Sequence, residues 1–295
     1  MEEGIDRGVY LFSSFRGNGE DGLHLAYSRD GLQWTALKDD KPFLKPIIGD
    51  KLMRDPCIVQ GPDGLFHMVW TTGWTDRGIG ISHSGDLLDW SEQEFLPVMN
   101  HEPGAHNCWA PEITWDPDAG QYVIFWATAL PGRFMETVPG EDPVMNHRIY
   151  CTTTSDFKTY TETRPFYDPG FSVIDSTIVR NGDRYMMITK DETHDPPAKN
   201  LHIATSDKVT GPWRKVSEPF TPEGLWVEGP TAIKIGRHWY VYFDVYREHR
   251  YGAMRTTDFE QWEDVSEKLK VPVGMRHGTV FFVADHILDP LLKRV

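Results

Sequence analysis

Short apolar runs separated by turn residues recur along the chain, and no long helical periodicity lies between them. The runs fall into groups of about four predicted strands, and the second strand of each group is rich in aromatic and β-branched residues. These second strands are residues 9–13, 65–70, 121–126, 184–188 and 238–243. The pattern predicts a protein built from short β-strands.

A polar phrase, Ser/Thr-x-Asp, follows the third strand of each group. Its five copies are marked by Asp30, Asp86, Asp156, Asp207 and Asp258, at intervals of 51 to 70 residues. In four copies an aromatic residue follows the aspartate by four positions. An aspartate in this setting accepts hydrogen bonds from nearby backbone N–H groups, so the phrase predicts a hairpin corner.

Four-stranded units repeated at this spacing are typical of propeller blades. The first repeat lacks its opening strand, and a single strand, residues 277–283, follows the last complete repeat. Together these ends make one blade, which closes the ring without an open sheet edge. The sequence therefore predicts one all-β domain, residues 1–295: a five-bladed β-propeller closed by pairing the C-terminal strand with the N-terminal strands. A β-sandwich is the alternative, but it explains neither the spacing nor the complementary ends.

Charge and hydropathy narrow the range of partners. The chain has 30 basic and 44 acidic residues, a net charge of −14. Such a chain repels phosphate backbones and anionic lipids, and its apolar runs are too short to span a bilayer. We therefore expect neither a nucleic-acid nor a membrane partner, and the oligomeric state stays open.

The cysteines and the N-terminus add little about function. Cys57, Cys108 and Cys151 have no metal-type spacing, and the first two lie in strand-like segments, so we expect small buried side chains. Residues 1–4 are acidic and show no signal peptide. A cytoplasmic location, or a periplasmic or secreted one after removal of a signal, remains open.

The first strand of each propeller blade lines the central channel, so the residues that open these strands are expected to converge. They are Asp55, Glu112, Asp175, Glu228 and His277. Four converging carboxylates repel one another, and at least one pKa should rise. Because a purely structural channel would carry small or apolar residues, the ring indicates a functional site for metal binding or acid–base hydrolysis of glycosidic bonds.

Five motifs carry a family resemblance, one in each blade. They are Arg54-Asp55-Pro56, Trp109-Ala110-Pro111-Glu112, Ile174-Asp175-Ser176-Thr177, Glu228-Gly229-Pro230 and Arg276-His277-Gly278. In this order they resemble glycoside hydrolase family 43 over essentially the whole chain.

The resemblance implies an inverting mechanism with three carboxylates. Asp55 matches the general base, Glu228 the general acid, and Asp175 the residue that favours the protonated form of the acid and orients it. Glu112 is an addition to this trio. It either contacts a sugar hydroxyl or is a channel carboxylate held by Arg54 or Arg276.

His277 matches a family position near a bound cation, frequently a calcium held largely through water. One imidazole without an oxygen cage is a poor calcium site, so we expect no required cofactor and leave a structural calcium in the channel open. A zinc hydrolase is disfavoured because no close His or Cys pair is present. A second group lies in predicted loops and is interpreted as solvated rather than metal-binding: His101, Glu102, His106, His147, Asp191 and His194.

Sugar recognition requires aromatic faces and hydrogen-bonding side chains near the channel mouth. The candidate substrate-binding residues are Arg54, Trp74, Trp109, Glu112, Phe134, Trp226, Arg276 and His277. The longest insertion, residues 130–147, is expected to cover the pocket and make the enzyme exo-acting.

These features favour an exo-acting glycosidase that removes α-L-arabinofuranose or β-D-xylose from plant polysaccharides or oligosaccharides, a substrate order that comes from the resemblance. β-D-Galactofuranosides and galactans are alternatives. A non-catalytic carbohydrate-binding propeller is also open, although it would not need all of Asp55, Asp175 and Glu228. A protein-interaction propeller would have no use for a carboxylate ring.

Overall fold

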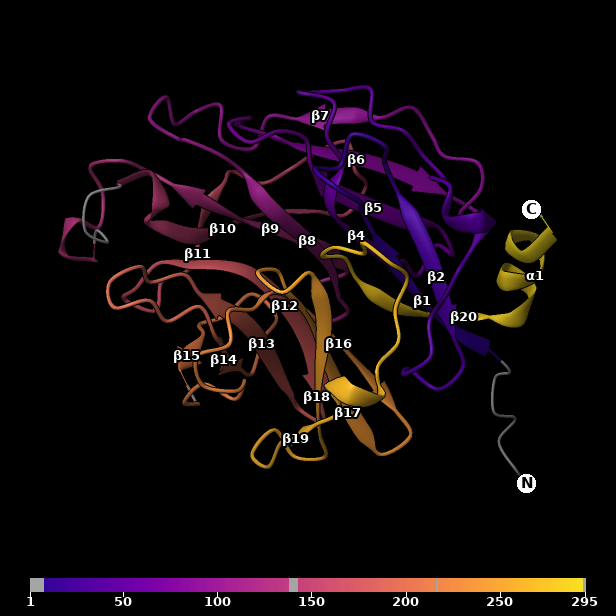
Figure 1. Ribbon diagram of the computed structural model, residues 1–295. Coiled ribbons are helices and arrows are strands. Elements are labelled where there is room, and N and C mark those ends of the chain that lie inside the picture. Colours follow the sequence, from indigo (N-terminus) through magenta and orange to yellow (C-terminus); the bar gives the residue numbers. More distant parts are fainter. Residues whose placement is uncertain (1–7, 138–142, 216, 294–295) are drawn as a thin grey trace.

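Twenty strands form five four-stranded antiparallel sheets in the computed structural model, which describes residues 8–137, 143–215 and 217–293. The sheets are arranged as the blades of a propeller (Figure 1). The predicted five-bladed fold is confirmed.

The blades are numbered from the closing seam. Blade I contains β20 (Val280–Ala284), β1 (Gly8–Ser14), β2 (His24–Ser28) and β3 (Thr35–Ala36). Blade II contains β4 (Arg54–Gln60), β5 (Phe66–Thr71), β6 (Ile79–Ser84) and β7 (Glu94–Leu96). Blade III contains β8 (Trp109–Asp116), β9 (Gln121–Ala129), β10 (His147–Thr154) and β11 (Arg164–Tyr167).

The remaining two blades follow the same order. Blade IV contains β12 (Val173–Asn181), β13 (Arg184–Asp191), β14 (Leu201–Ser206) and β15 (Arg214–Lys215). Blade V contains β16 (Glu228–Ile235), β17 (His238–Val245), β18 (Arg250–Thr256) and β19 (Glu263–Asp264). Among the described residues outside the sheets are one α-helix, α1 (Asp285–Lys293), and short helical turns at Lys38–Asp40, Met135–Thr137, Pro143–Met145 and Ser266–Lys268.

The two ends of the chain close the ring, as predicted. β20 pairs antiparallel with β1, placing Val283 opposite Val9 and Phe281 opposite Leu11. The strand begins at Val280 rather than at residue 277, so His277 lies in the segment before it. Helix α1, which the strand pattern did not predict, follows β20 directly.

The repeated aspartate phrase forms the predicted hairpin corners. In blade II, Oδ1 of Asp86 accepts hydrogen bonds from the backbone N–H groups of Leu88 and Asp89, both at 2.9 Å. Oγ of Ser84 accepts one from the N–H of Leu87 at 2.8 Å. The same bonds recur at Asp30, Asp156 and Asp258.

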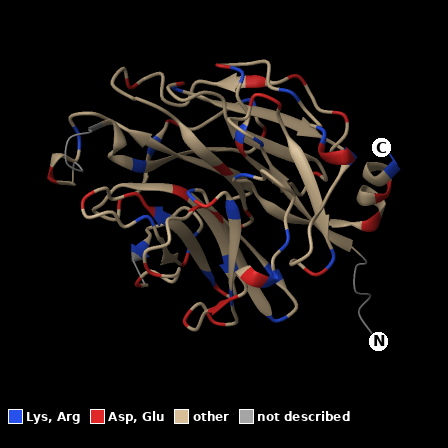
Figure 2. Ribbon diagram, in the orientation of Figure 1, with Lys and Arg blue, Asp and Glu red and all other residues tan. Residues whose placement is uncertain are grey.

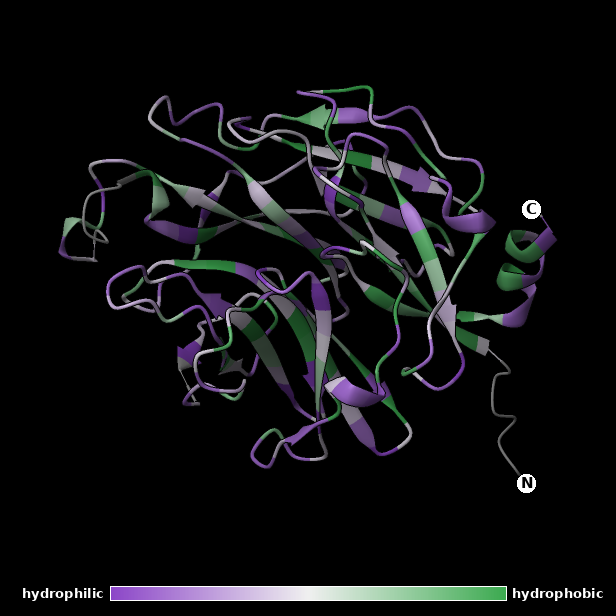
Figure 3. Cartoon of the chain, viewed as in Figure 1, coloured by the Kyte–Doolittle hydropathy of each residue, from purple (hydrophilic) through white to green (hydrophobic). Residues whose placement is uncertain are grey.

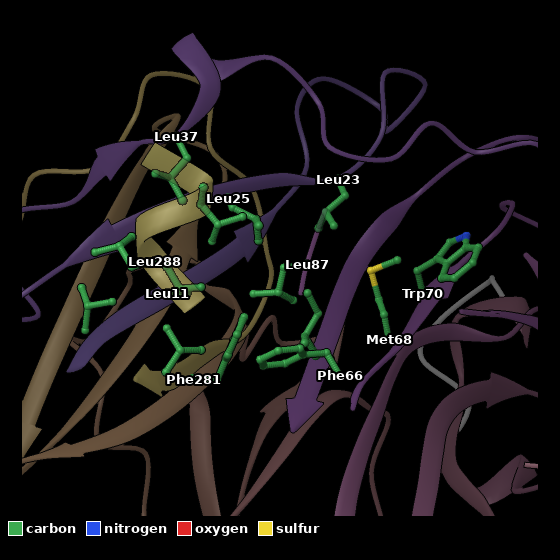
Figure 4. Packing of buried hydrophobic residues seen from close by; sticks show 14 of the residues in the cluster. Leu11, Leu23, Leu25, Leu37, Phe66, Met68, Trp70, Leu87, Phe281 and Leu288 are labelled. Carbon is green, nitrogen blue, oxygen red and sulfur yellow. The ribbon is translucent and has the colours of Figure 1, made fainter. Parts of the chain in front are cut away.

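The hydrophobic core lies between adjacent blades. Between blades I and II, Leu11 and Leu25 pack with Phe66 and Leu87, and α1 adds Leu288 to the same cluster (Figure 4). Burying one such side chain contributes roughly 1.5–3 kcal/mol. The strands carry bands of hydrophobic residues, whereas the loops are mostly hydrophilic (Figure 3).

The charged residues are spread over the surface (Figure 2), and the cysteines are buried as predicted. Acidic and basic residues are interspersed over the loops and strand ends (Figure 2). Cys57, Cys108 and Cys151 are all free and buried. Within the described ranges, no helix has the length and apolar character needed to cross a membrane.

Candidate active site

The inner strands of blades II to V carry a β-bulge at their first residues. The register of β4, β8, β12 and β16 shifts there, and one residue in each adopts positive φ: Asp55 (52°), Ala110 (44°), Asp175 (51°) and Gly229 (60°). Bulges re-aim side chains, and strained backbone of this kind is concentrated at functional sites. Two of the predicted channel residues, Asp55 and Asp175, lie at these positive-φ positions themselves.

Gly229 shows why the Glu-Gly-Pro motif needs its glycine. Besides its positive φ, a Cβ atom at this position would overlap the ring of His277. Its N–H donates a hydrogen bond of 2.9 Å to Oδ2 of Asp175. The glycine thus lets blade V approach blade IV and the seam closely.

The side chains converge on a pocket of 380 Å³ at the mouth of the channel. Of the predicted site residues, eight line it: Arg54, Asp55, Trp74, Trp109, Asp175, Glu228, Arg276 and His277. This volume is at the small end of the usual range for ligand pockets, so the pocket suits the short end of a ligand better than a long polymer.

Asp55 is held as a carboxylate. Thr71 donates a hydrogen bond of 2.8 Å to its Oδ2, and Nδ1 of His277 lies 3.3 Å from its Oδ1. Although burial opposes the charge, the hydrogen bond and charge of His277, followed by the charge of Arg54, lower the pKa of Asp55 to about 2. Asp55 is therefore ionised at any physiological pH and can accept a proton.

His277 joins two of the carboxylates. Its Nδ1 also lies 3.9 Å from Oδ2 of Asp175. Although burial opposes its charged form, the Asp55 hydrogen bond and the charge of Asp175 raise the pKa of His277 to about 9. Burial raises the pKa of Asp175 to about 6. The repulsion expected from the sequence is a smaller cause of this shift, since the charges of Glu228 and Asp55 add to the larger effect of burial.

Glu228 also lines the pocket, with 20% of its side chain exposed. Nη2 of Arg276 is 2.9 Å from its Oε1, and Nζ of Lys190 is 3.2 Å from its Oε2. Arg276 also donates through Nε to Asp244 at 2.5 Å. Burial raises the pKa of Asp244 to about 6, against the opposing effect of Arg276.

The sequence analysis missed several residues that line the pocket or hold its side chains, and three of them share one position in their blades. Thr71 is paired with Arg54, Lys190 with Ile174, and Asp244 with Glu228, each across the first two strands of a blade. All three stand at or near the end of an aromatic second strand, where a polar residue breaks the apolar run. This polar residue at the end of an apolar strand is the sequence feature by which the three residues could have been found. Asn18, Met145, Ile174, Glu192 and Tyr246 also line the pocket.

Two of the predicted aromatic residues, Trp74 and Trp109, lie together at the pocket. Trp74, 47% exposed, packs edge-on against Trp109, whose Nε1 donates to the Trp74 carbonyl at 2.9 Å. The guanidinium of Arg54 lies 4.3 Å from the Trp74 ring and 4.7 Å from the Phe15 ring. This stack fixes one wall of the pocket.

Glu112 does not share this pocket. It lines a separate cavity of 270 Å³ deeper in the channel, where hydroxyls of Thr177 and Thr279 donate to its carboxylate at 3.0 and 3.3 Å. Burial raises its pKa to about 7. Among the described residues, no bond joins Arg54 or Arg276 to Glu112, so the alternative in which an arginine holds Glu112 is wrong.

Two further predicted aromatics lie outside the described pocket lining. Phe134 stacks on the guanidinium of Arg148 at 4.3 Å. Trp226 is covered by the guanidinium of Arg247 at 3.5 Å and lines a neighbouring groove. A contact between either ring and substrate stays a prediction.

The insertion at 130–147 is described only in part, because residues 138–142 of the predicted cover lie outside the described ranges. Near its end, Met145 lines the pocket. His147, expected in a solvated loop, is instead buried at the start of β10 and stacks on Trp109 with a centroid separation of 4.9 Å. Its burial lowers its pKa to about 4. The interpretation of His147 as solvated is wrong, and so is that of Asp191, which is buried at the end of β13.

The residues around His277 do not form a direct ligand set for calcium. Within the part of the chain that the structure describes, no three His, Cys, Asp or Glu side chains are arranged to hold a metal ion. Nδ1 of His277 faces two aspartates, which favours the imidazolium form, and an imidazolium cannot donate a lone pair to a cation. A cation held through water stays an expectation.

Comparisons with known proteins identify the family and the fold. The sequence matches the family described as "Probable glycosyl hydrolase domain" over residues 6–289. An alpha-L-arabinofuranosidase of Bifidobacterium longum subsp. longum is 26% identical over 220 residues, which cover 63% of this chain but only 21% of that protein.

Solved structures share the fold at low sequence identity. One is an alpha-L-arabinofuranosidase from Lactobacillus brevis, with a TM-score of 0.54, 17% identity and 72% of each chain covered. Another is an exo-beta-1,3-galactanase from Phanerochaete chrysosporium, with a TM-score of 0.56, 11% identity, and 76% of this chain and 52% of that one covered. At such identities the likeness concerns the fold alone.

Proposed function

This chain belongs to glycoside hydrolase family 43, and on that premise we propose that it is an exo-acting, inverting enzyme that removes terminal α-L-arabinofuranose or β-D-xylose from plant polysaccharides or oligosaccharides. One observation carries the proposal. Asp55, an ionised carboxylate, and Glu228, a carboxyl held by cations, line the same pocket from blades that are not neighbours. Such a pair suits a base and an acid on opposite sides of a glycosidic bond.

In the proposed reaction, Asp55 takes a proton from a water molecule, whose oxygen attacks the anomeric carbon. Glu228 gives its proton to the glycosidic oxygen as the bond from that oxygen to the anomeric carbon breaks. The products are the leaving alcohol and a free sugar of inverted configuration. Asp175, bonded to the N–H next to Glu228, supports the position of the acid.

The choice of sugar rests on family membership and on the named activity of the Bifidobacterium relative, of which this chain spans 21%. The small pocket and the Trp74–Trp109 wall support a single terminal sugar stacked at the rim. Galactans and β-D-galactofuranosides are the alternatives that the experiment must separate.

Hydrolysis of a panel of 4-nitrophenyl glycosides tests the substrate, and proton NMR in the first minutes tests the stereochemistry. We expect release from the α-L-arabinofuranoside or β-D-xyloside, and the inverted anomer appearing first. Release from a galactoside alone would replace the substrate assignment. A retained anomer would contradict the role of Asp55 in activating water.

A further inference from the structure

Glu228 is held by two cations from the blades on either side of it. Arg276 reaches Oε1 from the segment before β20, and Lys190 reaches Oε2 from β13. Each cation also has a second carboxylate partner. Arg276 pairs with Asp244 at 2.5 Å, and Lys190 pairs with Glu192 at 2.7 Å. The carboxyl is therefore shared between two ion pairs.

This arrangement constrains a general acid. A cation beside each oxygen favours the carboxylate, whereas protonation of a leaving group needs the acid form. In the acid form, the proton of Glu228 has to share the carboxyl group with the contacts from Arg276 and Lys190. A buried cation left without a partner strongly destabilises the folded protein. The side chain of Lys190 is only 2% exposed, against 28% for that of Arg276. A second carboxylate partner, Glu192, is therefore needed more by Lys190 than Asp244 is by Arg276.

We propose that Lys190 and Glu192 form a positioning pair for Glu228, an inference that rests on the proposed role of Glu228 as the acid. Lys190 orients the carboxyl in the pocket. Glu192 keeps the ammonium paired while Glu228 carries its proton. Neither residue exchanges a proton with the substrate in this scheme.

The surroundings of the pair support this role. Glu192 is anchored from behind, because Nζ of Lys199 lies 2.7 Å from its Oε1 and donates to its carbonyl oxygen at 2.9 Å. Nζ of Lys190 also lies over the ring of Tyr246 at 4.8 Å. Both members of the pair and Tyr246 line the pocket.

Lys190 stays charged throughout. It is faced by the carboxylates of Glu192, Glu228 and Asp175 and by the ring of Tyr246. Although burial opposes its charge, these carboxylates raise the pKa of Lys190. The pair therefore acts on the carboxyl group of Glu228, and the charge of Lys190 itself does not change.

Two variants test the proposal through the basic limb of the pH profile of kcat/KM, which reports loss of the catalytic proton. Lys190→Met removes a cation from Glu228, so we expect the limb to move up by about one pH unit. Glu192→Gln leaves Glu228 as the nearest carboxylate to Lys190, so the limb should move down. Lys190→Arg keeps a cation beside Glu228, so its basic limb should lie close to that of the wild type.

A purely structural role would lower activity without opposite shifts, so shifts in one direction or no shift would overturn the proposal. Thermal unfolding checks each variant, and Glu192→Gln, which preserves size, decides the matter if Lys190→Met does not fold. The exposed pair Lys268–Glu263, 3.3 Å apart, supplies matched controls in Lys268→Met and Glu263→Gln.

Failure of the acid assignment is distinguishable from failure of the pair. A basic limb that persists in Glu228→Gln would overturn both the acid and the positioning pair. A limb that vanishes in Glu228→Gln but does not move in the Lys190 and Glu192 variants would overturn the pair alone.

Discussion

Arg276 and His277 are adjacent in the chain but contact different carboxylates of the pocket. Nη2 of Arg276 lies 2.9 Å from Glu228, and Nδ1 of His277 lies 3.3 Å from Asp55. Both come from the segment that precedes the closing strand β20. Closure of the ring therefore also sets the positions of the proposed acid and base.

Replacing Asp55 with Asn should lower kcat/KM by about 10²–10⁴-fold on every glycoside, because water activation is needed whatever the leaving group. Because the pKa of Asp55 is about 2, the wild-type enzyme should show no loss of the base above roughly pH 3. Steady-state rates on an oligosaccharide and on a 4-nitrophenyl glycoside provide the measurement. Substantial activity of the variant on both would count against Asp55.

Glu228→Gln should behave differently, because it removes the proton donor and keeps the size of the side chain. We expect a loss of about 10²–10⁴-fold on oligosaccharides and a much smaller loss on 4-nitrophenyl glycosides, whose leaving group departs without protonation. The ratio of the two losses is the quantity to measure. A near-wild-type rate on the oligosaccharide would show that another residue is the acid.

The pKa of His277 predicts a pH dependence of stability. Its folded pKa of about 9 lies above the ordinary value of 6.5. Its contribution is therefore fully present below about pH 6.5 and is lost as the pH rises toward 9. Urea unfolding of the wild type across this window should show falling stability, and His277→Gln should flatten the slope. An equal slope in both proteins would refute the charged histidine.

Chelation tests the cofactor expectation. Because the charged His277 faces Asp55 and Asp175 and no direct ligand set surrounds it in the described ranges, EDTA should leave kcat/KM unchanged. The measurement compares rates before and after dialysis against EDTA, with calcium restored as the control. A loss that calcium reverses would show that the enzyme needs a bound metal.

Trp74 should contribute to binding rather than to chemistry. Its exposed ring stands at the rim, so Trp74→Ala should raise KM about fivefold through loss of roughly 1 kcal/mol of stacking and leave kcat nearly unchanged. Phe95, exposed on the outer strand β7, supplies a control in Phe95→Ala. A fall in kcat alone would argue against a stacking role.

The sequence by itself determined the fold and the main carboxylates. The aspartate corners and aromatic second strands repeat because every blade has the same turn and packs against its neighbours in the same way. This repetition can be recognised in the sequence. The complementary ends likewise indicated the β20–β1 seam. Helix α1 escaped notice because one short helix carries little periodicity.

Only the tertiary structure decided which residues meet. Strand openings predicted Asp55, Asp175 and Glu228, but Glu112 lies in a separate cavity because depth along the channel depends on bulges and strand stagger. Lys190 and Asp244 were missed for a related reason. They reach Glu228 across strand pairing and between blades, and those contacts depend on how the blades pack together rather than on any spacing along the chain.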